Sequence, residues 1–225
     1  MTDTAAARSG PEDGAGLLVW YAAYGSNLRA ARFSTYLTGG PVPGSTGRIQ
    51  PGARDPEPPR DEATMTVPHR LRFARRSTSW GGGGVAFLDA DPPAGPSPGD
   101  RPTRPTRLRL WLVTLGQFAD VAAQENGRPP GAVDINPAGL AGLIERGHLD
   151  VDPGWYGRIL DLGRGPAGHR VVTVTAPRVA PPNPPHRSYV EVIVAGLMES
   201  FGLDEDDARL YIRHRIEPRD RIDGV

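Results

Sequence analysis

Residues 17–28 read LLVWYAAYGSNL, and this stretch decides how the rest of the chain is interpreted. The run from Leu17 to Ala23 is almost continuously apolar, which is typical of a strand buried on both faces at the centre of a sheet. It ends at Tyr24-Gly25-Ser26-Asn27-Leu28, and a helix is predicted from about Leu28 to Leu37. A central strand and a polar turn, followed directly by a helix, are therefore expected near the start of the chain.

The turn after this strand can direct several backbone N–H groups toward one spot. Such a nest near a helix N-terminus suits a carboxylate or a developing oxyanion. The same residue types also serve simply to cap a helix, so both interpretations stay open on the sequence alone. The turn is not a Gly-x-Ser-x-Gly nucleophile elbow, because Leu28 follows Asn27, and no Gly-Lys-Ser/Thr follows to make a phosphate loop.

The remaining elements are predicted from hydrophobic periodicity and from clusters of Gly and Pro. Strands are expected at 70–74, 84–89, 107–115, 156–162 and 170–176, and further helices at 114–127, 138–144, 188–201 and 204–215. Ser188 and Glu191 have the spacing of a capping box. Residues 38–62 and 92–105 look like surface loops. We expect residues 1–16 to be a disordered tail and residues 17–225 to form a single domain, because no long linker divides the chain.

Composition narrows the possible chemistry. The 225 residues include no cysteine, which excludes disulfides, thiolate metal sites and cysteine nucleophiles. No lysine is present either, which excludes a Schiff-base or general-base lysine. The formal net charge is zero, so there is no electrostatic case for nucleic acid or membrane partners. The polar start and the lack of a long apolar run favour a cytoplasmic location.

Histidines and clustered arginines give no metal or polyanion signal. The histidines are His69, His148, His169, His186 and His214. None has a histidine partner four residues away, the spacing of a helical metal pair, so no metal and no cofactor are predicted. The clusters at 70–76 and 101–109 alternate arginine with apolar residues, and solvated strand faces explain them better than a polyanion site.

Glu125 is the main candidate for proton transfer. It shares one face of the helix predicted at 114–127 with Phe118, Val121 and Ala122. A carboxylate on an apolar stripe is costly unless it is neutralised, paired or functional. Desolvation would raise its pKa and suit it to acid–base chemistry near neutral pH. The alternative, which periodicity alone favours, is a glutamate at a helix end that reaches solvent or pairs with an arginine.

Several blocks of sequence, taken in order, resemble the γ-glutamylcyclotransferase family. Tyr24-Gly25-Ser26-Asn27-Leu28 resembles the family's Tyr-Gly-Ser-x-Leu signature, and Gly82-Gly83-Gly84-Val85-Ala86 is similar to its Gly-Gly-Ile-Ala strand. Glu125-Asn126-Gly127 resembles the segment that carries the family's acid–base glutamate. Tyr156 and Tyr189 correspond to two pocket tyrosines. The blocks cover most of residues 17–212, and with them the balance for Glu125 moves toward function.

The resemblance implies an α+β fold with a small mixed barrel-like sheet flanked by helices. It implies conversion of a γ-glutamyl amine or amino acid to 5-oxoproline and the free amine, without a cofactor. Glu125 would be the catalytic residue. The residues implied in binding the small-molecule substrate are Tyr24, Gly25, Ser26, Asn27, Leu28, Tyr156 and Tyr189.

One departure and two alternatives accompany this interpretation. About 30 residues separate Glu125 from Tyr156, where shorter members of the family have only a few, so this insertion could reshape the pocket mouth. One alternative is a cyclotransferase that removes a γ-glutamyl group from a secondary metabolite. The other is a non-catalytic small-molecule binding module of the same fold, although a pure binder has no need of a desolvated base.

Overall fold

The computed structural model describes residues 16–43, 47–92, 104–178 and 180–216. The predicted N-terminal tail therefore lies outside the described residues except for Gly16, and so does most of the predicted loop at 92–105. Within the described residues no helix is long and apolar enough to cross a bilayer.

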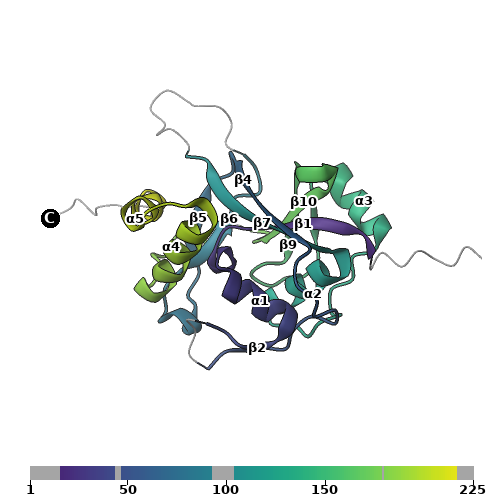
Figure 1. Ribbon diagram of the computed structural model, residues 1–225, viewed down its shortest axis with the longest axis horizontal. Coiled ribbons are helices and arrows are strands. Elements are labelled where there is room, and N and C mark those ends of the chain that lie inside the picture. Colours follow the sequence, from purple (N-terminus) through teal and green to yellow (C-terminus); the bar gives the residue numbers. More distant parts are fainter. Residues whose placement is uncertain (1–15, 44–46, 93–103, 179, 217–225) are drawn as a thin grey trace, which may run out of the picture.

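A six-stranded sheet forms the centre of the molecule (Figure 1). In order across the sheet, the strands are β4 (Asp61–Val67), β7 (Thr106–Thr114), β1 (Leu18–Ala23), β10 (Arg170–Thr175), β9 (Arg158–Arg164) and β8 (His148–Asp150). Strand β1 lies inside the sheet, parallel to β10 and antiparallel to β7, so the sheet is mixed. The central position predicted for the apolar run at the start of the chain is confirmed.

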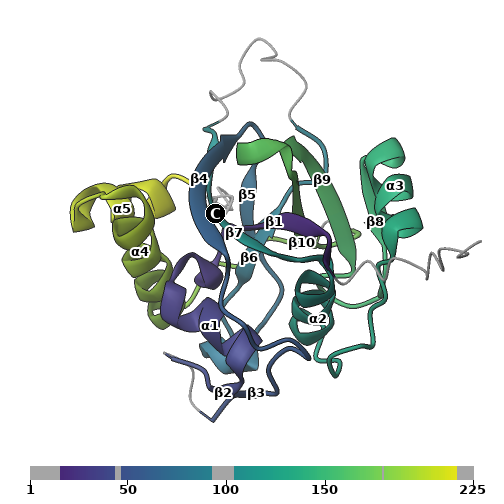
Figure 2. The same ribbon diagram turned by 45° about the vertical axis from the view of Figure 1, so that its right-hand side comes forward.

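Two further strand pairs lie outside this sheet. They are β2 (Gly40–Pro41) with β3 (Ile49–Gln50), and β5 (Leu71–Ala74) with β6 (Val85–Leu88). In Figure 2 the β5–β6 hairpin stands between β4 and β9. Oγ1 of Thr175 on β10 accepts from the Leu88 N–H at 3.2 Å and donates to the Leu88 carbonyl at 2.6 Å. The curved sheet and the hairpin together make the expected barrel-like arrangement.

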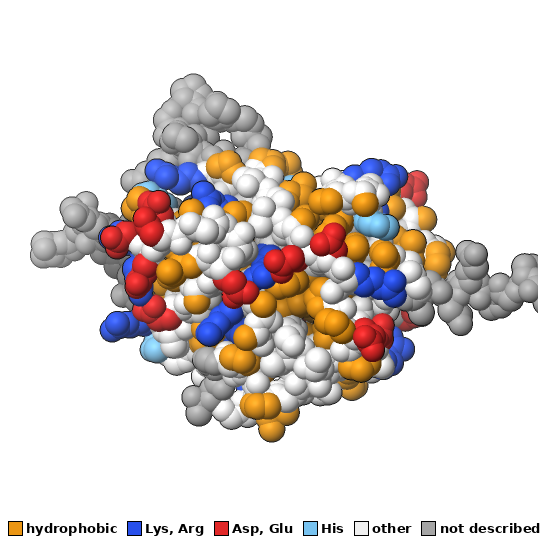
Figure 3. Space-filling model, in the orientation of Figure 1, with side chains coloured by type: hydrophobic (Ala, Val, Ile, Leu, Met, Phe, Trp, Pro, Cys, Tyr) orange, Lys and Arg blue, Asp and Glu red, His pale blue; other side chains and the backbone are white. Residues whose placement is uncertain are grey.

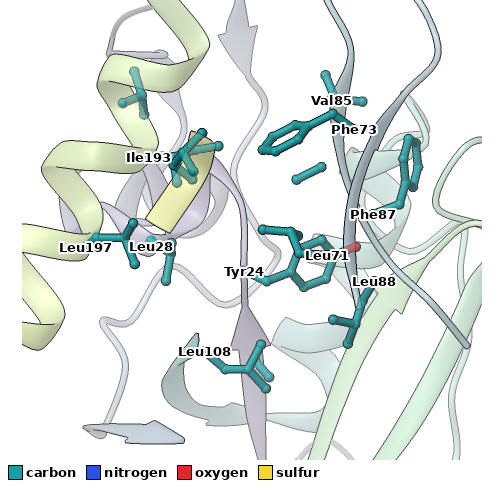
Figure 4. Close-up of a cluster of buried hydrophobic side chains, with 14 of the residues drawn as sticks. Tyr24, Leu28, Leu71, Phe73, Val85, Phe87, Leu88, Leu108, Ile193 and Leu197 are labelled. Atoms are coloured by element: carbon teal, nitrogen blue, oxygen red, sulfur yellow. The ribbon is translucent and has the colours of Figure 1, made fainter. Parts of the chain in front are cut away.

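Helices cover both faces of the sheet, as expected for the α+β class. They are α1 (Ala30–Thr38), α2 (Leu115–Glu125), α3 (Pro137–Arg146), α4 (Arg187–Phe201) and α5 (Glu205–Arg213), with single 3₁₀ turns η2 (Ser26–Leu28), η3 (Thr78–Trp80) and η4 (Pro166–Gly168). Helices α1, α2 and α3 pack on the face to which Val19 and Tyr21 contribute. Helices α4 and α5 pack with the hairpin on the other face, around Leu28, Ile193 and Leu197 (Figure 4). Strand β1 supplies side chains to both cores, which explains its apolar sequence.

Strand β4 is absent from the sequence-based prediction, which treats residues 38–62 as a surface loop. Its apolar residues Ala63, Met65 and Val67 alternate with polar ones, and every residue from Asp61 to Val67 pairs with β7. The preceding segment is also tied to the fold. Asp120 accepts hydrogen bonds from the backbone N–H of Arg54 at 2.8 Å and from its Nε at 3.0–3.2 Å.

The predicted capping box at Ser188 and Glu191 is wrong. His186 is the N-cap of α4, and its Nδ1 accepts from the Ser188 N–H at 3.2 Å. A capping box exists instead at the start of α2. There Thr114 Oγ1 accepts from the Gln117 N–H at 3.1 Å, while Gln117 Oε1 accepts from the Thr114 N–H at 3.0 Å. These two bonds fix where α2 begins and therefore where its last residue, Glu125, lies.

Candidate active site

A small cavity opens where β1 ends. Its lining residues are Tyr21, Tyr24, Gly25, Ser26, Asn27, Ala86, Glu125, Tyr156, Val174 and Tyr189. Its volume is about 40 Å³, enough for a few water molecules. The site therefore suits one compact polar group, and anything larger attached to that group has to lie at the mouth.

Tight packing holds the turn after β1 in place. Gly196 of α4 lies against η2 so closely that a Cβ on it would come within 2.6 Å of the Leu28 Cβ. The Leu28 side chain is fully buried in the core rather than in the cavity wall, and its carbonyl accepts from Arg109 Nη1 at 2.9 Å (Figure 4). Leu28, a predicted substrate-binding residue, therefore anchors the turn instead of lining the cavity.

Glu125 ends α2 with its carboxyl group in the cavity wall. Asn27 Nδ2 donates to Glu125 Oε1 at 2.8 Å and also to the Tyr21 hydroxyl at 3.1 Å. Burial raises the pKa of Glu125 above its ordinary value. The positive charge of Arg48 is the largest effect that opposes this rise, followed by a hydrogen bond with Tyr36. Glu125 thus combines a desolvated carboxyl group with access to a cavity.

The other end of the Asn27 amide has no partner among the described residues. Both hydrogens of Nδ2 are used, which assigns the orientation of the amide, and Oδ1 is buried with no donor from the described part of the chain. A buried acceptor without a donor is costly. An orphan acceptor beside a carboxylate makes a place where a ligand with several N–H groups would be stabilised.

The three predicted tyrosines surround the cavity but use their hydroxyl groups differently. Tyr24 donates to the Val174 carbonyl at 2.6 Å, and Tyr156 donates to the Ala86 carbonyl at 2.9 Å. Tyr189 instead accepts, from the backbone N–H of Ala86 at 3.2 Å. Burial raises the pKa of Tyr189 to about 12. Among these three, Tyr189 is the one whose proton is left for a ligand in the cavity.

Gly25 is required by the position of the Tyr189 hydroxyl. A Cβ at residue 25 would lie 2.9 Å from the Tyr189 oxygen and 3.3 Å from the Ala86 Cβ. The glycine in the turn therefore lets strand β6, helix α4 and the end of β1 meet at one point. The need here is close approach, since a positive φ is not involved.

Tyr156 reaches the cavity although a long insertion separates it from Glu125. Asn126, the C-cap of α2, bonds to both backbone groups of Tyr156. Its Oδ1 accepts from the Tyr156 N–H at 2.9 Å, and its Nδ2 donates to the Tyr156 carbonyl at 3.1 Å. The residue directly after Glu125 holds Tyr156, so the two ends of the insertion lie next to each other.

Sequence reasoning missed four residues that act on the site, one of them the buried Arg32, whose positive charge also lowers the pKa of Glu125. Tyr21 lines the cavity, Tyr36 bonds with Glu125, and Arg48 supplies a positive charge. Alternation along β1 could have identified Tyr21, because it puts residues 19, 21 and 23 on one face. Arg48 gave no such signal, since it lies just before β3 in a segment predicted as a surface loop. Among the described residues, no group of three or more His, Cys, Asp or Glu side chains is placed to hold a metal ion.

Comparisons with known proteins give only partial matches to this chain. No protein-family model matches the chain. Histone deacetylase 5 from Arabidopsis thaliana is 33% identical over 208 residues, which cover 86% of this chain and 30% of that protein. The chain thus spans less than a third of the relative's length.

Two solved structures are similar at low identity. YkqA from Bacillus subtilis has a TM-score of 0.44 and 15% identity, over 88% of this chain and 54% of that one. A yeast γ-glutamyl cyclotransferase specific to glutathione has a TM-score of 0.30 and 13% identity, over 92% of this chain and all of that one. Both scores are below 0.5, so the link to the cyclotransferases rests on the sequence blocks and on the cavity that they line.

Proposed function

We propose that this cavity converts a γ-glutamyl amine or amino acid to 5-oxoproline and the free amine. The observation that carries the proposal is the pairing of Glu125 with Asn27. The amide donates to the carboxylate and leaves its own oxygen without a donor. An α-ammonium group in the cavity would satisfy that oxygen and at the same time place a proton next to the base.

The reaction would proceed by intramolecular aminolysis. Glu125, as carboxylate, takes a proton from the α-ammonium of the γ-glutamyl group. The freed amine attacks the γ-carbonyl carbon, and the five-membered ring closes as the bond to the leaving nitrogen breaks. Glu125 returns its proton to that nitrogen, and the other proton lost by the attacking amine leaves with the product amine. A pKa raised by burial suits this double role, because the group has to accept and release a proton near neutral pH.

Negative charge develops on the γ-carbonyl oxygen during attack. The Tyr189 hydroxyl already accepts from the Ala86 N–H, so its own proton is available to this oxygen. Gly25 and Ser26 line the same cavity, and the backbone N–H of Gly25 would assist. The cavity of about 40 Å³ would take the α-ammonium group, while the rest of the substrate, with the leaving group, lies at the mouth.

The test is incubation of the purified protein with γ-glutamyl amino acids and γ-glutamylamines, followed by detection of 5-oxoproline. We expect 5-oxoproline with at least one substrate and none above background from the Glu125→Gln variant. Calorimetry on the same panel provides a second readout. Binding without 5-oxoproline from any substrate would replace the enzyme with a binding module. Neither binding nor turnover would overturn the substrate class.

A further inference from the structure

A second hollow lies beside α5, away from the cavity at the end of β1. Its volume is about 430 Å³, and it shares no lining residue with that cavity. Its walls are Thr66, Arg104, Pro105, Arg107, Leu203, Asp207, Leu210, Tyr211, His214 and Arg215. In Figure 3 basic side chains gather beside α5, near the β4 edge of the sheet. We call this hollow the α5 groove.

Positive charge predominates in the α5 groove. Three arginines line it against a single carboxylate, that of Asp207. Within the described part of the chain, no carboxylate lies within ion-pair distance of Arg104, Arg107 or Arg215. Arg209 on the same helix is different, because it pairs with Glu191 at 2.6 Å and with Glu205 at 2.7 Å. Among the described residues, no carboxylate therefore neutralises the charge of these three arginines, in contrast to Arg209.

Arg107 and Arg215 are held by packing, whereas Arg104 is exposed. The Arg107 guanidinium lies 5.2 Å from the Phe201 ring centre and 5.9 Å from that of Tyr211, and its backbone N–H donates to the Tyr211 hydroxyl at 2.9 Å. Arg215 stacks on the other rim, 3.3 Å from the Tyr211 ring centre. Positions fixed in this way lower the conformational entropy lost on binding.

The donors in the groove are not used up. Arg215 donates to the Tyr211 and Pro105 carbonyls, at 2.7 and 2.6 Å, but its Nε is buried without a partner. No side-chain hydrogen bond engages Arg107 or Arg104 within the described residues. A buried donor without an acceptor is a cost that an anion in the groove would remove.

We propose that the α5 groove binds a small organic phosphate. The planar guanidinium forks of Arg104 and Arg107 match phosphate oxygens, and an arginine fork can bind two of them at once. Leu203 and Leu210 supply an apolar wall for the organic part. A long polyanion fits less well, because three arginines make too small a patch for it and the formal net charge of the chain is zero. The proposal is independent of the chemistry at Glu125.

The first test is calorimetric titration of the full chain with ADP, inorganic pyrophosphate and adenosine. The variant carries both Arg104→Gln and Arg107→Gln, and the control is Arg187→Gln, an arginine of α4 whose side chain is 89% exposed. We expect ADP to bind the wild type and the control alike. Its affinity should fall at least about tenfold in the double variant, because two guanidinium groups that would donate charge-assisted hydrogen bonds to the phosphate are lost. Binding should also weaken as salt is added.

Each probe distinguishes one outcome. Adenosine binding as tightly as ADP would overturn the role of phosphate. If pyrophosphate bound as tightly as ADP, the organic part of the ligand would have no role in binding. The same would follow if the Leu210→Ala variant bound ADP as tightly as the wild type. The proposed phosphate site would be overturned if the double variant bound ADP with unchanged affinity. It would also be overturned if an acidic peptide bound the wild type and ADP did not.

A second measurement on the wild type guards against misfolding of the variant. Desolvation and the positive charges of Arg104, Arg215 and Arg213 lower the pKa of His214. A phosphate in the groove would offset those charges and raise that pKa. We expect the His214 ring signals in NMR to titrate at higher pH when ADP is present, while the indole N–H signal of Trp20, which donates to the Pro166 carbonyl, stays unchanged. Equal movement of both, or of neither, would place ADP elsewhere.

Discussion

Helix α2 carries two acidic groups five residues apart, Asp120 fully buried and Glu125 half-buried, and they serve different purposes. Asp120 has 1% of its side chain exposed, and its oxygens accept from the backbone N–H groups of Arg54 and Gly131, both at 2.8 Å, and from Arg54 Nε. Glu125 accepts from Asn27 and opens onto the cavity. The first carboxylate is surrounded by fixed donors from two loops. The second has a free side toward a place where a ligand can sit.

The comparison shows that burial by itself does not identify a catalytic carboxylate. A carboxylate saturated by fixed donors has its hydrogen-bonding capacity used up and fastens the chain together. A carboxylate that is desolvated, with few donors and room beside it, can exchange protons with a ligand. Opposite results are therefore expected when each of the two groups is replaced by its amide.

The largest expected effect is on turnover in Glu125→Gln. The amide keeps the shape but cannot accept a proton from the α-ammonium, so 5-oxoproline release should fall at least about a hundredfold. Binding of the same substrate, measured by calorimetry, should survive because the cavity wall is unchanged. Full activity in this variant would place the base elsewhere.

The same variant should become more stable at neutral and higher pH. Burial raises the pKa of Glu125 above its value in the unfolded chain, so its contribution to stability is fully present below the unfolded pKa and is lost as pH rises through the folded one. Glutamine avoids that loss. We expect the Tm of Glu125→Gln to exceed that of the wild type at pH 8, with the difference shrinking toward pH 4. A lower Tm at pH 8 would indicate a structural role.

Asp120→Asn should instead destabilise the chain by about 2–4 kcal/mol. The new amide hydrogens would oppose the N–H groups of Arg54 or Gly131 and leave buried donors without acceptors. Urea denaturation at pH 7 measures the loss, and the folded fraction should keep near-normal turnover because Asp120 does not line the cavity. A stable Asp120→Asn variant with lost turnover would reverse the roles of the two carboxylates.

The sequence distinguishes these two residues only in part. Periodicity places Glu125 on the apolar stripe with Phe118 and Val121. The family resemblance pairs Glu125 with the turn at residues 24–28. Asp120 is off that stripe, and its donors come from residues 54 and 131, which periodicity along one helix cannot connect to it. Contacts made between distant segments leave no local pattern.

The fold was more predictable than the site for a similar reason. Strands such as β1 and β7 bury continuous or alternating apolar residues, and Gly and Pro mark the ends of most helices. Strand β4 escaped because its outward residues are Asp61, Glu62, Thr64 and Thr66, within a segment rich in Pro and charge. In the site, Arg48 acts across space through its charge, which sequence spacing does not encode.

A smaller effect is expected from Gly25→Ala, which tests the cavity wall opposite Glu125. The added methyl group would push the Tyr189 hydroxyl, now 2.9 Å from where the Cβ would be, out of its bond with the Ala86 N–H. We expect kcat to fall about tenfold, since small misplacements of a transition-state donor are costly. Tyr189→Phe provides the matched comparison, and the double variant should be no worse than the poorer single one. Additive losses would mean that the glycine acts independently of Tyr189.

The smallest expected effect concerns Arg48, and its sign follows from the charge. The positive charge of Arg48 lowers the pKa of Glu125 against the rise caused by burial. In Arg48→Gln that opposition is lost, so the pKa of Glu125 should rise further. The reactive form is the carboxylate, which means that the acidic limb of kcat/KM against pH should move to higher pH.

At pH values well above this limb the two proteins should have equal kcat/KM, because Glu125 is then ionised in both. The Arg187→Gln variant, which changes an exposed side chain of α4, should follow the wild-type curve at every pH. A uniform loss of activity at all pH values would show that Arg48 contacts the substrate instead of tuning the base. A shift of the limb to lower pH would contradict the charge argument, because removing a nearby positive charge cannot stabilise a carboxylate.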